Sequence, residues 1–348
     1  MMTKVPESTE IFIVGSFVVA CTVKVARLPR PGESLDATGF VVEPGGKGFN
    51  LAVTAHRLGA RVDGVFAIGR DPFADLALAA FKRAGLSTDM VGRHDTSTGA
   101  GVGFIDARGE NCLAVHLGAN ARLSAADIRR VADSVSGAVL VMATFESPDA
   151  PILAAFTLAR EAGRPTLLNP SPHRRMDPEI LARTAILVVN EVEAAALGSD
   201  LGLESDLGEE VLETEPSAGL AGPAEAYRPI AQRLMAGGPE MVVVTLGAAG
   251  AVAFRRGHAP LHQAAIPVET VDTIGAGDAF AAGLAAGLVR DRPFAECLLR
   301  AAACGAIATR TFGAFDAFPT DQELEAFLAT EAGLARPSAV PEAAGARL

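Results

Sequence analysis

The residues whose types and spacing suggest chemistry stand together near the end of the chain. Gly275, Ala276 and Gly277 lead into an alanine-rich helical pattern, and Asp278 follows them directly. Small residues at a helix start leave its unpaired N–H groups open to an anion, and the helix dipole adds positive potential there. A carboxylate beside such an anion hole is well placed to accept the proton of an incoming hydroxyl. This arrangement suits phosphoryl transfer to an alcohol, which depends mainly on positioning and charge stabilisation.

A second glycine-rich stretch, near the start of the chain, also precedes a helical pattern. Gly46, Lys47 and Gly48 are followed by Asn50. Glycines let ligand hydroxyls approach the main chain, Lys47 supplies donors, and Asn50 can donate or accept. The alternative is that Lys47 and Asn50 only cap and solvate a helix. For Asp278 the corresponding alternative is a helix cap, because aspartate is a favoured capping residue.

Further polar and glycine residues follow short apolar runs in the middle of the chain. Asn190 comes at the end of such a run, and Glu193 stands three positions later, which is also the spacing of a capping box. Thr245, Gly247 and Gly250 form a tight glycine turn after another run. Taken alone, that turn is an ordinary exit from a strand.

Apolar runs and helical patterns alternate along most of the chain. Strands are expected at residues 11–14, 62–69, 138–143, 166–169, 186–190 and 242–246. Their alternation with helices implies an α/β fold, in which a mainly parallel sheet is covered on both faces and ligands bind at the carboxyl ends of its strands. Residues 16–44 and 98–118 show strand-like alternation instead, which predicts a small separate sheet.

Composition excludes several classes of function. Of the 348 residues, 49% are hydrophobic and 20% are charged, so the chain is globular. A formal net charge of −11 argues against a general nucleic-acid or membrane surface. The four cysteines form no CxxC pair and indicate reduced, buried thiols of a cytoplasmic protein. No stretch approaches the ~20 apolar residues of a membrane span.

Six landmarks in one order resemble the ribokinase-like (PfkB) carbohydrate kinases over roughly residues 11–330. They are Gly45-Gly46-Lys47-Gly48-x-Asn50, Glu146-Ser147-Pro148, Asn169-Pro170, Asn190-x-x-Glu193, Thr245-Leu246-Gly247-x-x-Gly250 and Asp272-Thr273-x-Gly275-Ala276-Gly277-Asp278. The resemblance implies one kinase domain over residues 1–335, with a ribokinase-like central sheet flanked by helices and a small β lid from 16–44 and 98–118. It leaves an acidic insertion at 198–226, expected to be mobile, and a tail at 336–348.

The resemblance also implies an activity and a set of roles. The enzyme is expected to transfer a phosphoryl group from ATP to a primary hydroxyl of a sugar, with Asp278 as base and 275–277 as anion hole. The residues expected to hold the sugar are Gly46, Lys47, Asn50 and Glu146, and those expected at the nucleotide are Asn190, Thr245, Gly247 and Gly250. Glu193 is expected to act on Mg²⁺ through water, and Asp272 and Ile274 to contribute to a monovalent cation (K⁺) site. Glu146 has a simpler alternative as a helix-start carboxylate. A homodimer through the β lid is expected, because an isolated small sheet leaves apolar surface to cover.

One departure from the family pattern bears on the substrate. The first strand of ribokinases continues into Gly-Ser-x-Asn-x-Asp, whose polar pair grips sugar hydroxyls, but here Val18 and Ala20 occupy those positions. A ligand hydroxyl buried without a partner costs about 1–3 kcal/mol. Ala302 likewise stands where ribokinases often place an Asn beside adenine. The landmark set still favours D-ribose. The alternatives are a nucleoside kinase of the same family and a non-catalytic sugar- or nucleotide-binding regulator, although a pure binder has no need of Asp278.

Overall fold

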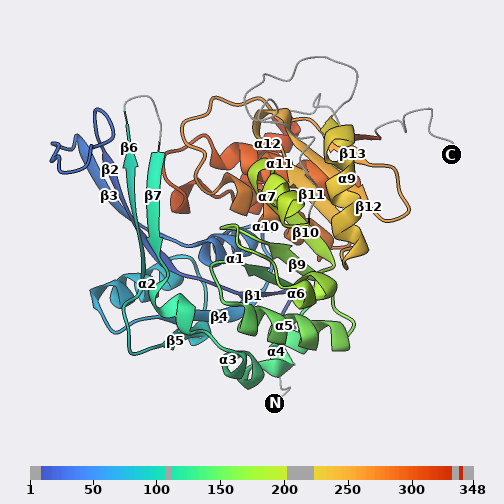
Figure 1. Cartoon of the computed structure of the whole chain (residues 1–348), viewed down its shortest axis with the longest axis horizontal. Coiled ribbons are helices and arrows are strands. Elements are labelled where there is room, and N and C mark those ends of the chain that lie inside the picture. Colours follow the sequence, from blue (N-terminus) through green and yellow to red (C-terminus); the bar gives the residue numbers. More distant parts are fainter. Residues whose placement is uncertain (1–8, 107–110, 202–222, 331–336, 340–348) are drawn as a thin grey trace.

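The apolar runs of the sequence form the strands of one large sheet. The structure, a computed structural model, describes residues 9–106, 111–201, 223–330 and 337–339. In these residues a ten-stranded sheet has the order β14-β13-β12-β11-β10-β9-β8-β1-β4-β5 (Figure 1). Its strands are β1 (Ile11–Val14), β4 (Val62–Ile68), β5 (Val91–Arg93), β8 (Leu140–Thr144), β9 (Thr166–Asn169), β10 (Ile186–Asn190), β11 (Met241–Thr245), β12 (Ala251–Arg255), β13 (Leu261–Gln263) and β14 (Ser338–Ala339).

Strand direction divides this sheet into two parts. The strands from β5 to β11 in the sheet order pair in parallel. From β11 to β14 the pairing is antiparallel. The predicted α/β fold with a mainly parallel sheet is therefore confirmed.

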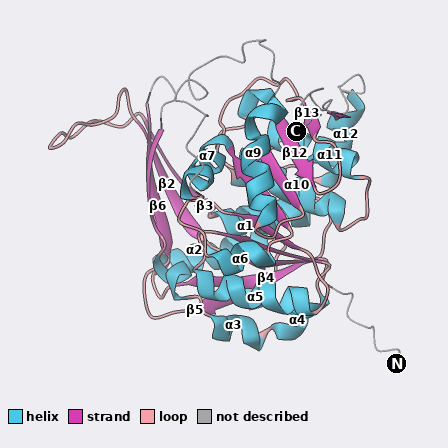
Figure 2. Cartoon of the chain, turned by 45° about the vertical axis from the view of Figure 1, so that its right-hand side comes forward, coloured by secondary structure: helices cyan, strands magenta, loops and turns pink. Residues whose placement is uncertain are grey.

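Helices cover both faces of the sheet, so its central strands are buried throughout. In β1, Ile11 and Ile13 join one hydrophobic cluster, and Phe12 and Val14 join the other. The first cluster contains residues of α1 (Lys47–Arg57), α2 (Pro72–Arg83), α10 (Ala276–Leu288), α11 (Phe294–Ala308) and α12 (Asp321–Thr330). The second contains residues of α3 (Ala125–Arg130), α4 (Ala132–Gly137), α5 (Asp149–Glu161), α6 (Pro178–Arg183), α7 (Glu191–Asp200) and α9 (Pro223–Ala236). Figure 2 shows α5 and α9 lying in front of the strands.

The two stretches expected to form a small sheet do so. Strands β2 (Val18–Lys24), β3 (Gly39–Gly45), β6 (Gly99–Ile105) and β7 (Asn111–His116) form a four-stranded sheet of order β3-β2-β6-β7. It stands beside the main sheet (Figure 1). We call it the lid sheet.

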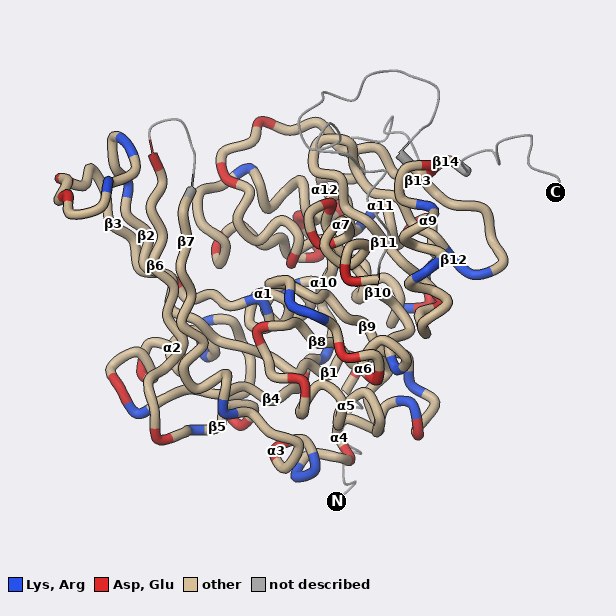
Figure 3. Tube along the Cα trace, in the orientation of Figure 1, with Lys and Arg blue, Asp and Glu red and all other residues tan. Residues whose placement is uncertain are grey.

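The lid sheet has an inner and an outer face. On the inner face, the Lys24 ammonium lies 3.9 Å from the centre of the Phe312 ring, so this face is turned toward the α11–α12 connection. Ala20 of β2 pairs with Gly101 of β6, which pairs with Val115 of β7, so the three residues form one row on the inner face. Leu113 of β7 lies two residues from Val115 and therefore on the same face. The outer face exposes an apolar group consisting of Phe40, Val42 and Val102. Figure 3 shows the middles of β2, β6 and β7 free of charged residues.

Close helix packing fixes the C-terminal helices against the sheet. A Cβ added at Gly283 or Gly287 of α10 would meet the sulfur of Cys304 at 2.8 Å or of Cys297 at 2.9 Å, so α11 approaches α10 closely. Burial raises the pKa of the Cys297 thiol to about 11 and of the Cys304 thiol to about 12. All four cysteines are free, but Cys112 is exposed, so the expectation of burial is wrong for that thiol.

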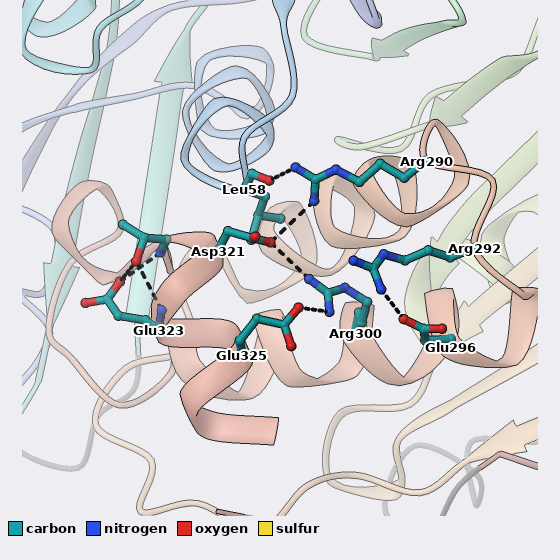
Figure 4. Close-up of polar contacts among 9 residues, drawn as sticks. Leu58, Arg290, Arg292, Glu296, Arg300, Asp321, Glu323 and Glu325 are labelled. Carbon is teal, nitrogen blue, oxygen red and sulfur yellow. Dashed lines mark hydrogen bonds and ion pairs between the residues drawn. The ribbon is translucent and has the colours of Figure 1, made fainter. Parts of the chain in front are cut away.

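Arginines fasten the far ends of these helices together (Figure 4). Arg290, just after α10, donates to the Leu58 carbonyl at the end of α1. The same side chain lies 3.3 Å from Asp321 of α12, and buried Arg300 of α11 bridges Asp321 at 3.0 Å and Glu325 at 2.6 Å. α1 and α10 are thereby held together at the ends remote from their glycine-rich starts.

Two segment boundaries differ from expectation. In the stretch 198–226, residues 198–200 end helix α7 and residues 223–226 begin helix α9, because the apolar side chains of Leu197, Ala224 and Tyr227 are buried against the sheet. The middle of that stretch lies outside the described residues. Within the stretch expected to be a tail, Ser338 and Ala339 form β14 and pair with β13. In the part of the chain that the structure describes, no helix combines the length and apolar character needed to cross a membrane.

Candidate active site

The start of α10 has the open geometry that an anion hole needs. Gly275 caps the helix with φ 80°, and a Cβ there would lie 2.9 Å from the Phe318 ring, so this position requires glycine. Gly277 lies within the first turn, and a Cβ there would meet nothing within 4 Å. The Ala276 N–H donates to the Thr273 carbonyl at 3.2 Å, which tightens the turn before the helix. The open space is therefore beside Gly277.

Asp278 is buried and does not cap its own helix. Its Oδ2 accepts from Asn50 Nδ2 at 2.8 Å, and its Oδ1 lies 3.7 Å from Lys47 Nζ. Buried Oδ1 has no hydrogen-bond partner in the described part of the chain. The helix-cap interpretation is wrong, because Gly275 is the cap and the carboxylate faces α1. Oδ1 can therefore accept a proton from a ligand.

The Lys47 ammonium is held in its charged form by carboxylates. The Asp278 carboxylate is the main cause of the raised pKa of Lys47, and Glu146 and Glu193 add to it against the opposing effect of burial. These three acids therefore act on one cation. Lys47, Asn50, Glu146, Glu193 and Asp278 come from four separate elements of the chain, and the fold brings them to one place.

Glycines allow the start of α1 to press onto the turn between β1 and β2. Gly46 has φ 96°, and a Cβ there would lie 2.8 Å from the Val18 nitrogen. A Cβ at Gly48 would lie 2.2 Å from the Ser16 nitrogen. The Gly48 N–H instead donates to Ser16 Oγ at 3.0 Å. These glycines are needed for packing between chain segments, which the sequence did not reveal.

Glu146 connects the same turn to α1. Its Oε2 accepts from the Ser16 hydroxyl at 2.6 Å and from the Lys47 N–H at 2.7 Å, and the side chain is 7% exposed. Burial is the main cause of the raised pKa of Glu146, opposed by Ser16 and Lys47. The helix-start interpretation is wrong, because no side chain caps α5, which follows at Asp149.

Asn190 and Glu193 form a reciprocal capping box at the start of α7. Asn190 Oδ1 accepts from the Glu193 N–H at 2.8 Å, and Glu193 Oε2 accepts from the Asn190 N–H at 3.0 Å. Asn190 pairs with Thr245 in the adjacent strand, so these two predicted positions are neighbours at the carboxyl ends of β10 and β11. The capping interpretation is confirmed. The charge of buried Glu193 also helps to raise the pKa of Lys47.

The two glycines after Thr245 have different surroundings. Gly247 has φ 50° with open space where a Cβ would stand. Gly250 has φ 96°, and a Cβ there would lie 2.0 Å from the Gln263 carbonyl oxygen. Gly250 is thus required by the close approach of the chain after β13, whereas Gly247 borders open space.

Asp272 fixes the loop that leads into α10. Its Oδ1 accepts from the Ile274 N–H and its Oδ2 from the Gly313 N–H, both at 3.0 Å. The Ile274 side chain is 40% exposed. In residues 9–106, 111–201, 223–330 and 337–339, no group of three or more His, Cys, Asp or Glu side chains is arranged to hold a metal ion.

Sequence reasoning missed two residues that hold this region together. Ser16, which follows the first strand, links Glu146 to Gly48. Asn120 accepts from the Phe17 N–H at 3.0 Å and donates to the Phe17 carbonyl at 2.8 Å. It thereby ties the turn before the lid sheet to the segment after it. A lone polar residue in Gly118-Ala119-Asn120 was the only sequence signal.

The chain is similar to known proteins over most of its length. The family model "pfkB family carbohydrate kinase" matches residues 8–321. Ribokinase of Mus musculus is 31% identical, over 91% of this chain and 94% of its own length. Deoxyribokinase of Salmonella typhi is 28% identical, over 92% of this chain and 98% of its own length.

Solved structures of ribokinases are also similar to this protein. An Arabidopsis thaliana ribokinase complexed with ribose and ATP has a TM-score of 0.79 and 26% identity, covering 92% of this chain and 99% of that one. Ribokinase of Thermotoga maritima has a TM-score of 0.78 and 27% identity, with the same coverage. The protein is a sugar kinase with a ribokinase-like fold. It belongs to the pfkB family of carbohydrate kinases.

Proposed function

We propose that this sugar kinase transfers the γ-phosphoryl group of ATP to the primary hydroxyl of a pentose, with D-ribose as the first candidate. The observation that carries the proposal is the buried Asp278 carboxylate, whose Oδ1 has no hydrogen-bond partner among the described residues and lies beside the open first turn of α10. The ribose and ATP bound to the Arabidopsis thaliana ribokinase support both substrates.

In this proposal Asp278 takes the proton of the reacting hydroxyl. The N–H groups around 275–277 stabilise the charge of the transferred group. Gly46, Lys47, Asn50 and Glu146 hold the sugar. Lys47 and Asn50 contact Asp278, and Glu146 accepts from the Lys47 N–H. The nucleotide lies along the neighbouring ends of β10 and β11, at Asn190, Thr245, Gly247 and Gly250.

The same proposal assigns two cation sites. Glu193 fits a water-mediated Mg²⁺ contact, because its buried carboxylate is oriented by the capping box at the proposed phosphate end of the site. Asp272 fits a monovalent cation site together with the Ile274 carbonyl, because two backbone N–H groups fix its carboxylate at the edge of the anion loop. Mg²⁺ would supply charge neutralisation at the phosphates. Free thiols at all four cysteines support a cytoplasmic location.

Substrate choice is tested at the inner face of the lid sheet. Ala20→Asp adds a carboxylate in the row of Gly101 and Val115, where ribokinases have a polar residue. If the substrate is ribose, a charge-assisted hydrogen bond contributes about 1.5–3 kcal/mol, so KM for ribose should fall about ten-fold. The measurement is kcat/KM for ribose, 2-deoxyribose, fructose, adenosine and inosine on both proteins.

Ala20→Val is the matched control, because it adds bulk without a hydrogen-bonding group and should not improve ribose. The ribose assignment is lost if the wild type prefers a nucleoside and Ala20→Asp removes that preference without a gain on ribose. Such a result would support the nucleoside-kinase alternative. The non-catalytic alternative is already disfavoured by membership of a kinase family with an intact Asp278.

We further propose a homodimer through the outer face of the lid sheet. Phe40 is 64% exposed there, beside Val42 and Val102, and a second copy would cover this apolar group. Phe40→Asp should convert a dimer into a monomer in sedimentation or light-scattering measurements. Leu113→Asp is the control, because Leu113 is 63% exposed but lies on the inner face. A wild-type monomer, or a dimer that survives Phe40→Asp, would contradict the proposal.

A further inference from the structure

Arg174 lies in the connection between β9 and α6 and makes an unusually complete set of contacts with another loop. Its guanidinium donates to the Phe145 carbonyl and, at 2.8 Å, to the Ser147 carbonyl. It also pairs with the Asp149 carboxylate at 2.5 Å, and it lies 4.1 Å from the centre of the Phe145 ring. All three guanidinium nitrogens therefore point into the loop at residues 145–149.

These contacts straddle Glu146. The two carbonyls that Arg174 binds belong to the residues before and after it, so the peptide group that precedes Glu146 and the peptide group that follows Ser147 are anchored to one planar, rigid group. The Phe145 N–H is held from the same connection, because it donates to the Ser171 carbonyl at 3.1 Å. The main chain at Glu146 is thus fixed from the β9–α6 side.

We propose that Arg174 is a positioning residue, which aims the Glu146 carboxylate at the start of α1 and thereby sets the sugar-binding geometry. Glu146 Oε2 receives the Ser16 hydroxyl and the Lys47 N–H, so a shift of the Glu146 main chain moves the first turn of α1. That turn carries Lys47 and Asn50, which contact Asp278. Arg174 therefore acts on the substrate only through other residues.

Arg174 acts on Glu146 by fixing its main chain and not by its positive charge. The charged groups that act on the buried Glu146 carboxylate are Lys47 and Asp278. The positive charge of Arg174 is matched by Asp149. A lysine at position 174 would keep the charge but lose the fork that spans two carbonyls. Arg174→Lys should consequently resemble Arg174→Ala and not the wild type.

The kinetic test compares KM for the sugar with KM for ATP. This part rests on the proposed role of Glu146 in sugar binding. In Arg174→Ala, the loss of hydrogen bonds to a charged group should raise KM for the sugar about ten-fold, with KM for ATP within about two-fold. Guanidinium ions at a sub-denaturing concentration should lower the sugar KM of Arg174→Ala toward the wild-type value, while potassium chloride of equal ionic strength should not.

A second test needs no activity. Amide hydrogen exchange of the peptide that contains Lys47 should accelerate about ten-fold in Arg174→Ala and Arg174→Lys, because the acceptor of the Lys47 N–H is no longer fixed. Arg256→Ala is the matched control, since Arg256 also donates to two carbonyls, those of Met235 and Pro239, but on another part of the chain. It should leave both the exchange at Lys47 and the sugar KM unchanged.

The outcomes separate this inference from the proposed function. Unchanged exchange at Lys47 in both Arg174 variants overturns the inference whatever the substrate is. Faster exchange with an unchanged sugar KM upholds the coupling but contradicts the role of Glu146 in sugar binding. An equal rise of both KM values, with a fall in Tm and the same acceleration across all peptides, would show a merely structural arginine and overturn the proposal.

Discussion

Replacing Asp278 by Asn should lower kcat by about 10²–10⁴-fold, because an amide cannot take the proton of the attacking hydroxyl. The side chains are nearly the same size, so the packing around the start of α10 should survive. Asn50 now donates to Oδ2, and Oδ1 is free to accept. The measurement is the turnover of ATP at saturating sugar, with Tm recorded for the same samples.

Asp127→Asn is the matched control for the loss of one carboxylate charge. Asp127 is also largely buried, but it belongs to the capping box at Ser124 on the opposite layer of helices. It should keep kcat within a few-fold of the wild type. Near-normal turnover by purified Asp278→Asn would remove both the base and the proposed mechanism.

Gly277→Val should abolish activity while leaving the protein folded. The Cβ of residue 277 enters open space at the proposed phosphoryl position, and the backbone there is outside the left-handed region. Valine is tolerated in a helix better than glycine, so stability should change by less than about 0.5 kcal/mol. Blocking the anion hole should cost at least about 10²-fold in kcat.

Gly137→Val provides the comparison, because Gly137 also lies in a helix with nothing within 4 Å of an added Cβ. It should leave both activity and Tm close to the wild type. Persisting turnover by Gly277→Val, with an unchanged KM for ATP, would place the phosphate elsewhere. Gly275 is unsuitable for this test, since its φ of 80° and its contact with Phe318 make any substitution there a folding defect.

Strand order along the chain was predictable because parallel strands buried on both faces are short apolar runs. The runs at 166–169 and 186–190 coincide with β9 and β10, since each ends in a polar asparagine. Residues 125–137 form two short helices, α3 and α4, which are divided at Val131, whose backbone is not helical. No glycine or proline marks that break, so the sequence carried no local sign of it.

The glycine-rich starts of α1 and α10 were recognisable because backbone exposure requires small residues in a row. The residues that surround these helix starts could not be recognised from the sequence. Ser16 and Glu146 are 130 positions apart, and Asn120 and Phe17 are 103 apart, so only the folded chain brings them together. The close packing of Gly250 could not be predicted either, because the segment that touches it belongs to a different loop. Long-range contacts of single polar residues leave no periodic pattern in a sequence.

The contact between α1 and α10 also has a consequence for how the protein is made. Asn50 and Asp278 are 228 positions apart, and Leu58 and Arg290 are 232 apart. Ribosomes release the amino-terminal part of a chain first. The start of α1 is therefore made long before α10, the helix that it contacts, has been synthesised. Closing so long a loop is a late and slow event in folding. An unfinished chain therefore contains the residues of α1 but no assembled base. It should not transfer phosphate from ATP until α10 has been made and has packed against α1.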